Sequence, residues 1–346
     1  MRKFLLTLVA AICCATIFAT EGVHQLDSVI SENYDGGKGK LVYSYDARGN
    51  KSSTITYKWD DPTSAWKALY KTTFSYNEMD SLVQRIEYKW DENIEIWCSS
   101  SQTEYEYNDM GQKISYTHTG SSTTEREEYN YDSNGNIINV ISYFNSEINR
   151  KDEYSYINGQ LVELLRSYWH SGYQSWELHS KYEWTRNSEG AILTEVFYYW
   201  KDNISDWKEN NKIQNTYDAQ GRLVNSISST WEDNTWEKSS MQTFTYNEEG
   251  QLLTRIGQWW VNNQWVNAQK DENTYNEHGD ISQYEELSWD DNEWKLLYRY
   301  IYFYASAHGI EQIVNGQSSN RKLMKDGQLL IERNGRTYNA LGAEVK

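Results

Sequence analysis

The chain has 346 residues, with 33 Lys or Arg against 50 Asp or Glu and a formal net charge of −17. An aromatic content of 15% excludes an intrinsically disordered polymer, because such chains lack the large apolar side chains that offset ordering entropy. The negative charge argues against a nucleic-acid partner, whose phosphates require Lys and Arg. A mean hydropathy of −0.86 with one apolar run excludes a multi-span membrane protein.

The N-terminus has the pattern of a secretory signal peptide. Met1-Arg2-Lys3 is basic, residues 4–19 are apolar, and polar sequence resumes at Glu21. We therefore predict a signal peptide at residues 1–20, cleaved on export through the periplasm. A retained anchor is the alternative, but sixteen apolar residues are short for a membrane span.

The cysteines of the chain bear on how it is exported and stabilised. A lipoprotein attached at Cys13 or Cys14 is a minor alternative to the cleaved signal peptide. After cleavage no transmembrane span remains, and Cys98 is the only cysteine, so no internal disulfide is expected. We assign residues 21–40 to an N-terminal leader or cap.

Residues 41–304 contain an internal repeat. A Tyr-Asn/Asp-x-x-Gly theme and its variants place turns at residues 49, 80, 111, 135, 159, 190, 221, 250 and 279. Successive turns are separated by 31, 31, 24, 24, 31, 31, 29 and 29 residues. Self-similarity of this kind is the sequence signature of a repeat architecture.

Tryptophan explains the three repeat lengths. Fourteen of the sixteen Trp form pairs: Trp59 with Trp66, Trp90 with Trp97, Trp169 with Trp176, Trp200 with Trp207, Trp231 with Trp236, Trp260 with Trp265, and Trp289 with Trp294. The first Trp always lies ten residues after a turn position, and in six pairs the second lies fourteen residues before the next turn. Only the spacing within a pair varies, between seven and five, and the two 24-residue units lack the Trp-flanked insert.

Each unit is predicted to be a hairpin of two long strands. Ile86, Tyr88 and Trp90 alternate with charged residues, as in a half-buried strand. The returning stretch of residues 66–76 is expected to alternate in the same way, with Trp66, Ala68, Tyr70, Thr72, Phe74 and Tyr76 on one face. Polar residues between paired Trp mark the hairpin tips. Because the two tip lengths differ by an even number, paired Trp are expected to stay opposite each other.

The predicted fold is all-β, a repetitive antiparallel β-hairpin meander of about eighteen strands. Open sheets rarely exceed about ten strands without curling or splitting. We therefore expect a coiled sheet, a spiral or a large barrel. The core is expected to consist of Tyr, Trp and the aliphatic residues Ile55, Ile86, Ile141, Leu165, Val196, Ile227 and Ile256.

Two segments resemble known families. Tyr217-Asp218-Ala219-Gln220-Gly221-Arg222-Leu223, like the stretches 45–50 and 131–136, resembles the YD (RHS) repeat. That resemblance implies β-hairpin sheets of the kind that coil into shells on exported toxins and adhesion proteins. Here the period is longer and uneven, the tips carry Trp, and there is no room for an encapsulated toxin, so only the architecture is carried over.

The C-terminal segment 305–346 contains a stretch, Lys322 to Lys346, that looks like a type IX secretion sorting tail of the Bacteroidetes. The resemblance rests on Asp326-Gly327, Asn334-Gly335, Tyr338-Asn339 and Gly342 before the basic end Lys346. It implies a contact with the secretion machinery. From the residues alone, Asp-Gly and Asn-Gly are two-residue hairpin signals, so a small three-strand element is expected. The alternative is a hairpin that caps the repeat array.

No catalytic motif is recognisable, so we predict that the protein is not an enzyme and needs no cofactor. Metalloprotease His spacing, a Gly-x-Ser-x-Gly elbow and a Gly-rich phosphate loop are all missing from the sequence. The acidic tips could bind Ca²⁺ through oxygen ligands.

The fourteen paired Trp are the candidate ligand-binding residues. Aromatic faces beside Asp and Asn suit stacking on sugars, whereas the alternative role is cross-strand stabilisation of hairpins. The sequence favours an exported cell-surface or secreted ligand-binding or adhesion module, for a glycan or a protein. The alternatives are a structural envelope component or a glycan-degrading enzyme.

Overall fold

The computed structural model describes residues 24–306, 320–325, 328–333, 336–339 and 344–345, and these contain strands but no helix. Twenty strands form one sheet: β1 (His24–Asn33), β2 (Lys38–Tyr45), β3 (Lys51–Asp60), β4 (Ala65–Tyr76), β5 (Leu82–Asp91), β6 (Ile96–Tyr107), β7 (Lys113–Thr119), β8 (Thr124–Tyr131), β9 (Ile137–Phe144), β10 (Glu147–Ile157), β11 (Gln160–His170), β12 (Ser175–Arg186), β13 (Ile192–Lys201), β14 (Asp206–Tyr217), β15 (Leu223–Glu232), β16 (Thr235–Tyr246), β17 (Leu252–Val261), β18 (Gln264–Tyr275), β19 (Ile281–Asp290) and β20 (Glu293–Ser306). A separate four-stranded sheet holds β21 (Asn320–Lys325), β22 (Gln328–Arg333), β23 (Arg336–Asn339) and β24 (Glu344–Val345).

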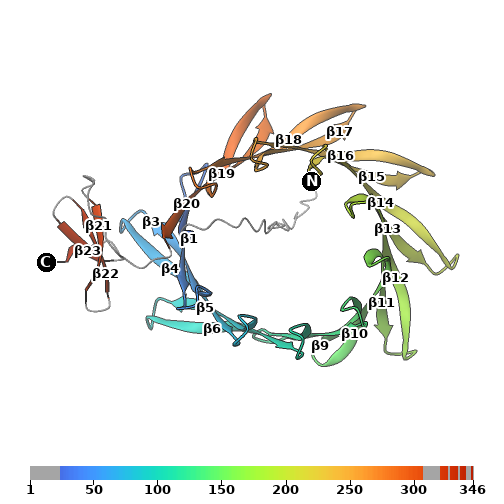
Figure 1. Cartoon of the computed structure of the whole chain (residues 1–346), viewed down its shortest axis with the longest axis horizontal. Helices are drawn as coiled ribbons and strands as arrows, with labels where there is room; N and C mark the ends of the chain where they lie inside the picture. The colour runs from blue at the N-terminus through green and yellow to red at the C-terminus, as the bar shows by residue number, and fades with distance from the viewer. Residues whose placement is uncertain (1–23, 307–319, 326–327, 334–335, 340–343, 346) are drawn as a thin grey trace. The chain divides into compact units, whose positions relative to one another are not determined.

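The large sheet is a closed antiparallel meander. Each strand from β1 to β20 pairs with the next strand in the chain, as in β13 with β14 and β14 with β15. The ring closes where β1 pairs with β20, and the N–H of Tyr34 donates to the carbonyl oxygen of Leu297 at 3.0 Å. Figure 1 shows the strands following one another around this ring. The all-β prediction is confirmed, and among its three forms the large barrel is the correct one.

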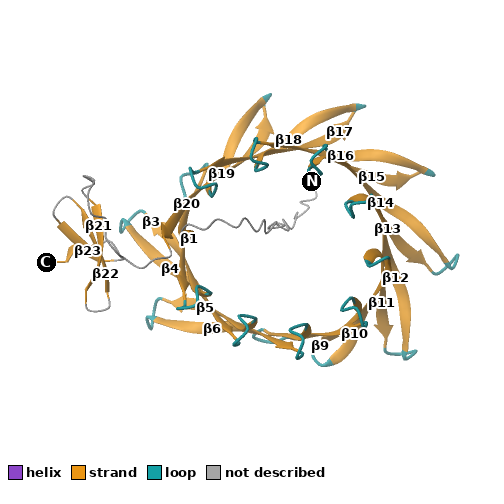
Figure 2. Ribbon diagram, viewed as in Figure 1, coloured by secondary structure: helices purple, strands orange, loops and turns teal. Residues whose placement is uncertain are grey.

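Nine hairpins, β3–β4 to β19–β20, supply the eighteen expected strands. The remaining hairpin, β1–β2, was not predicted as part of the sheet, since most of it lies in the segment assigned to a leader. Figure 2 shows the long hairpins pointing their closed ends to the outer circumference, whereas the turns that join successive hairpins lie around the inner circumference. The barrel therefore has a tip rim and a turn rim.

The barrel has almost no dry core. Val29 and Val140 are the only buried apolar residues among those described, and no large side chain there is fully buried. Barrels of about sixteen strands or more are too wide for interior side chains to fill. The seven aliphatic residues expected in the core are half-buried instead. Stability must therefore depend on the backbone ladder and on contacts between neighbouring strands.

The Asn/Asp of each repeat motif builds its turn. In the turn that begins at Asp132, the carboxylate accepts hydrogen bonds from the N–H groups of Asn134 and Asn136, both at 2.8 Å. The side-chain hydrogen bond and backbone hydrogen bond from Asn136 lower the pKa of Asp132. Gly135 closes the turn with a φ of 85°, in the left-handed region that only Gly adopts without strain.

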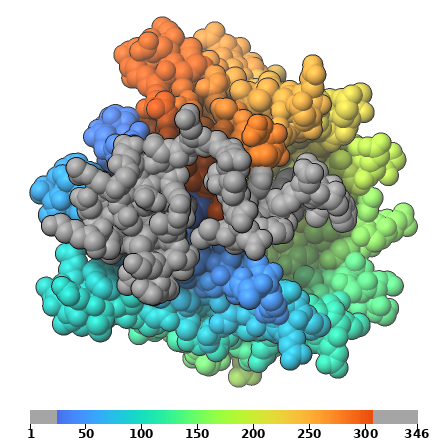
Figure 3. All heavy atoms as spheres, turned by 60° about the vertical axis from the view of Figure 1, so that its left-hand side comes forward, coloured from blue at the N-terminus to red at the C-terminus, as the bar shows by residue number. Residues whose placement is uncertain are grey.

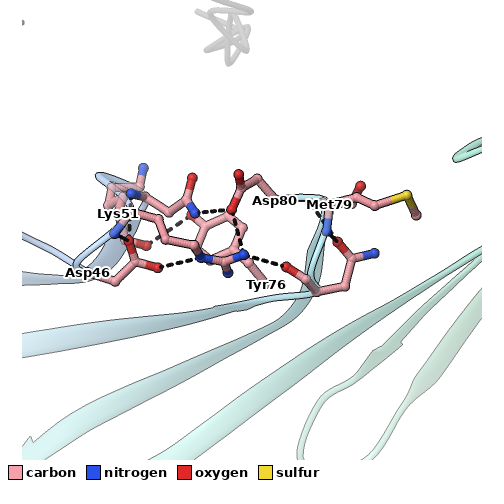
Figure 4. Close-up of polar contacts among 9 residues, drawn as sticks. Asp46, Lys51, Tyr76, Met79 and Asp80 are labelled. Carbon is pink, nitrogen blue, oxygen red and sulfur yellow. Dashed lines mark hydrogen bonds and ion pairs between the residues drawn. The ribbon is translucent and has the colours of Figure 1, made fainter.

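The Tyr of each motif ties together the two strands of one hairpin at the end opposite its tip. In seven units its hydroxyl donates to the carbonyl oxygen of the residue two positions after the preceding turn, at 2.7–3.0 Å. The donors are Tyr76, Tyr107, Tyr131, Tyr156, Tyr217, Tyr246 and Tyr275. Figure 4 shows Tyr76 reaching Lys51 in this way, with Asp46 and Asp80 in the adjacent turns. We call this contact the Tyr latch.

Asp80 occupies the place of the turn glycine, with a φ of 59°. Because a residue with a Cβ is strained in this region, we expect Asp80→Gly to raise the free energy of unfolding by about 0.5–1 kcal/mol. Urea titration followed by circular dichroism measures the change. The gain is reduced by the lost contacts of the Asp80 carboxylate with Arg48 and Asn50, so Asp80→Asn is the control for charge. A Gly variant less stable than the Asn variant would contradict the strain.

The small C-terminal sheet forms its own unit. β21 pairs with β22, β22 with β23 and β23 with β24, all antiparallel. The described residues do not include 326–327 and 334–335, where Asp-Gly and Asn-Gly were expected to form turns. They also do not include residues 1–23, which contain the predicted signal peptide. The three expected strands are present, and the two-residue β24 is added to them.

Candidate binding rim

The paired Trp face each other at the tip rim. In all seven long hairpins the two Trp are direct cross-strand partners. Their ring centroids lie 4.8–5.2 Å apart, with interplanar angles of 62–70°. This edge-to-face arrangement matches the attraction between the positive edge of one ring and the negative face of the other. The prediction that paired Trp stay opposite each other is confirmed.

Two kinds of tip produce the same Trp geometry. Where the pair is five residues apart, a two-residue turn such as Asp233-Asn234 has positive φ at both positions, as in a type I′ turn. Where the pair is seven residues apart, the turn has four residues and ends on one positive φ, as at Ser64. The hairpins β7–β8 and β9–β10 are short and carry no Trp pair, which divides the pairs into groups of two and five.

A β-bulge shows that one sequence prediction was wrong, namely that the alternating residues from Trp66 to Tyr76 all lie on one face of the sheet. Tyr57 pairs with Ala68 and Thr56 pairs with Tyr70, so Leu69 is the extra residue. Trp66 and Ala68 therefore face one side of the sheet, whereas Tyr70 and the residues that alternate with it face the other. The same bulge lies three residues after the second Trp in every long hairpin, at Leu69, Ser100, His179, Asn210, Ser239, Ala268 and Leu297.

All fourteen candidate indoles are half-buried, which limits the area that a ligand could contact on any one of them. They are Trp59, Trp66, Trp90, Trp97, Trp169, Trp176, Trp200, Trp207, Trp231, Trp236, Trp260, Trp265, Trp289 and Trp294. One face or edge of each indole is turned toward its cross-strand partner, as between Trp90 and Trp97, or between Trp289 and Trp294. The structure therefore shows the cross-strand role of these residues, whereas their expected contact with a ligand stays a prediction.

Cations cover part of four of these indoles. In four hairpins a Lys from a neighbouring hairpin lies over one indole: Lys151 over Trp176, Lys181 over Trp207, Lys212 over Trp236 and Lys238 over Trp260, at 4.7–5.4 Å from the centroid. Lys238 also lies 5.9 Å from the centroid of Trp265. Such cation–π contacts hold neighbouring tips together. Part of each of these indole surfaces is therefore used inside the protein, and the rest remains open to solvent.

The tips also expose large apolar side chains that the sequence analysis did not single out. Six residues at or next to the tips are 44–76% exposed: Ile94, Ile96, Tyr173, Ile204, Trp259 and Val261. In the space-filling view several hairpin ends project from the surface (Figure 3). The presence of these apolar side chains within otherwise polar turns is the sequence signal that could have identified them.

Acidic residues lie at several of the tips. The side-chain hydrogen bond and charge of Lys295 lower the pKa of Asp290, with Nζ and carboxylate oxygen 2.6 Å apart. Hydrogen bonds from Thr63 and Lys67 likewise lower the pKa of Asp60. Both carboxylates therefore stay ionised at neutral pH. Within the described part of the chain, no group of three or more His, Cys, Asp or Glu is arranged to hold a metal ion.

The geometry defines a closed all-β repeat barrel with a rim of projecting aromatic hairpins. Among the residues that the structure describes, no helix is both long and apolar enough to cross a membrane.

Comparisons with known proteins give only distant likenesses to solved structures. No protein-family model and no curated protein matches the chain. Among solved structures, the TcdB2-TccC3-TEV structure is similar over 91% of this chain and 17% of that chain, at 12% identity and a TM-score of 0.41. A porin-like protein from Bacteroides uniformis is similar over 81% of this chain and 96% of that chain, at 10% identity and a TM-score of 0.33. A DUF3836 family protein from Parabacteroides distasonis matches 32% of this chain and 93% of its own, at 18% identity and a TM-score of 0.21.

At TM-scores below 0.5 these likenesses carry no argument about fold, ligand or partner. The YD-repeat and sorting-tail resemblances stay predictions, as does the role of the fourteen Trp in ligand binding.

Proposed function

We propose that this chain is an exported, non-enzymatic protein that binds a partner protein at the cell surface through its tip rim. The observation that carries the proposal is the exposure of Ile94, Tyr173 and Ile204 on three different projecting hairpins. Burial of exposed apolar surface is the dominant favourable contribution to most protein–protein association. The aliphatic Ile94 and Ile204 do not stack on sugar rings, and the Tyr173 ring already stacks on His170 at 4.3 Å, so the tips fit a protein better than a glycan.

The acidic tips specify the charge of the partner. Asp91, Glu92 and Glu95 lie at the tip that carries Ile94, and Asp202 and Asp206 lie at the tip that carries Ile204. A partner with Lys and Arg around an apolar patch is therefore favoured over an acidic one. Several hairpins contacting one partner together would gain affinity by avidity, even if each contact is weak. In this proposal the segment 1–20 directs export and the tail 305–346 delivers the barrel to the surface.

Site-specific photo-crosslinking on intact cells tests this function. A photoreactive phenylalanine analogue at Tyr173 or Ile204 is expected to form adducts with a surface protein. The same analogue at Met110 is not, although Met110 on the turn rim is 78% exposed. Purified wild-type barrel should compete for the adducts, whereas a barrel with Ile94, Tyr173 and Ile204 replaced by Ser should not. Equal adduct yields at Met110 and at the tips would contradict the proposal and favour a structural envelope role.

A further inference from the structure

One junction on the turn rim departs from the repeat pattern. Arg186 stands at the position that Tyr occupies in the other motifs. Its Nε donates to the carbonyl oxygen of Leu161 at 3.0 Å, which is the acceptor that a Tyr latch would use, and its Nη1 donates to the carbonyl oxygen of Gly190 at 2.8 Å. The preceding turn is also different, because Asn158-Gly159 connects β10 and β11 with two residues, where the other motif turns have five.

A groove lies beside Arg186, next to the shortened turn. The groove has a volume of about 500 Å³ and is lined by Asn158, Gln160, Trp184, Arg186, Asn187 and Ser188, among others. A second groove of about 390 Å³ lies at the next junction and shares Asn187 and Ser188 with the first. Two adjoining grooves of this kind can accommodate more than one unit of a linear ligand.

Trp184 gives the first groove an aromatic wall. It is one of the two Trp outside the cross-strand pairs, and it lies on the same strand face as Arg186, two residues away in β12. Its Nε1 donates to the carboxylate of Glu195 at 2.7 Å, and its ring stacks on Tyr182 at 5.9 Å with an interplanar angle of 9°. These contacts hold the orientation of the indole.

Arg186 is also electrostatically distinct. Nine Arg lie between residues 41 and 304, and the other eight each have a carboxylate within 4.0 Å. Arg186 has no such partner among the described residues and donates to carbonyl oxygens instead. A guanidinium has five N–H donors, so three remain for a ligand after the two carbonyl contacts. In a chain of net charge −17, this is an unusual place for an uncompensated cation.

We propose that this groove binds a carboxylate-bearing sugar, a hexuronate unit of an acidic glycan. The free edge of the Arg186 guanidinium matches a carboxylate in bidentate geometry. The indole of Trp184 provides an apolar surface for the sugar ring, and Asn158, Asn187 and Ser188 provide donors and acceptors for its hydroxyls. The site is on the turn rim and does not depend on the partner proposed for the tips.

Calorimetric titration with tri-galacturonate tests the site, with the fully methyl-esterified trimer as the uncharged control ligand. Wild-type barrel is expected to bind the acid trimer and to bind the ester at least tenfold more weakly. Arg186→Tyr restores the residue of the regular repeat and its latch, so it should fold normally yet lose at least tenfold in affinity. Trp184→Ala should also weaken binding, whereas Arg126→Gln, which removes an exposed ion-paired arginine, should not.

Three results would overturn the proposal. They are no binding of the acid trimer by wild-type barrel, equal binding of acid and ester, and an unchanged affinity in Arg186→Tyr with its melting temperature preserved. Sulfate or phosphate competing as well as galacturonate would show that Arg186 binds small anions without recognising a sugar, which also overturns it. The Ile94, Tyr173 and Ile204 triple Ser variant should retain full affinity for the trimer, so failure of either proposal leaves the other intact.

Discussion

Deletion of residues 222–250 is expected to yield a folded barrel of eighteen strands. The deletion removes the hairpin β15–β16 and joins Gly221 to Gln251, so β14 and β17 meet through an equivalent turn. Tyr217 pairs with Leu223 in the intact chain, and Leu252 would take that place. Because each hairpin contacts its neighbours along the chain, the loss should be local. An even number of strands also preserves the antiparallel closure of β1 on β20.

Deletion of residues 222–234 is the matched control. It removes β15 alone and connects β14 to β16, two strands that run in the same direction. A parallel pair cannot be joined by a tight turn, and nineteen strands cannot close antiparallel. We expect this shorter deletion to expose sheet edges and to aggregate. Circular dichroism and light scattering on purified proteins measure both outcomes. Equal behaviour of the two deletions would show that ring closure does not govern folding.

The regularity of the repeat explains why so much of the fold could be predicted. Strand pairing within a hairpin is local, and the constant ten-residue distance from turn to Trp fixes each register. Closure of the ring could not be predicted in this way, since it depends on a contact between β1 and β20, far apart in sequence. β1 carries neither the Trp nor the turn motif, so its membership of the sheet had no repeat signal.

The bulges and the exposed tip residues are further features that the sequence pattern could not predict. Period-two alternation holds only while no extra residue is inserted, and nothing in the types found at the bulge position, from Leu69 to Asn210, marks it. Exposure of Ile94 or Tyr173 depends on how far each tip projects, which alternation does not determine. The role of Arg186 could not be predicted because Asn187 to Gly190 fit the turn motif, and the replacement of the preceding Tyr by Arg looks like ordinary variation within a repeat.

Loss of one cross-strand Trp pair is expected to destabilise the barrel measurably. In the β15–β16 hairpin, Trp231 and Trp236 lie 5.0 Å apart at an interplanar angle of 63°. We expect a double-mutant cycle of Trp231→Val and Trp236→Val to give a coupling energy of about 0.5–1.5 kcal/mol, which is the range for aromatic pairs beyond area burial. Urea unfolding followed by far-ultraviolet circular dichroism measures each variant without relying on indole fluorescence.

Trp259→Val is the matched control in the next hairpin. Trp259 is 51% exposed and lies beside the pair of Trp260 and Trp265 without belonging to it. Its replacement should change the free energy of unfolding by no more than about 0.5 kcal/mol. If Trp231→Val is as mild as Trp259→Val, the pairs contribute little to stability, and contact with a ligand becomes the better explanation of their regular spacing. If the coupling is found, the Trp pairs act first as structural partners. Binding at the tip rim would then depend mainly on Ile94, Tyr173 and Ile204.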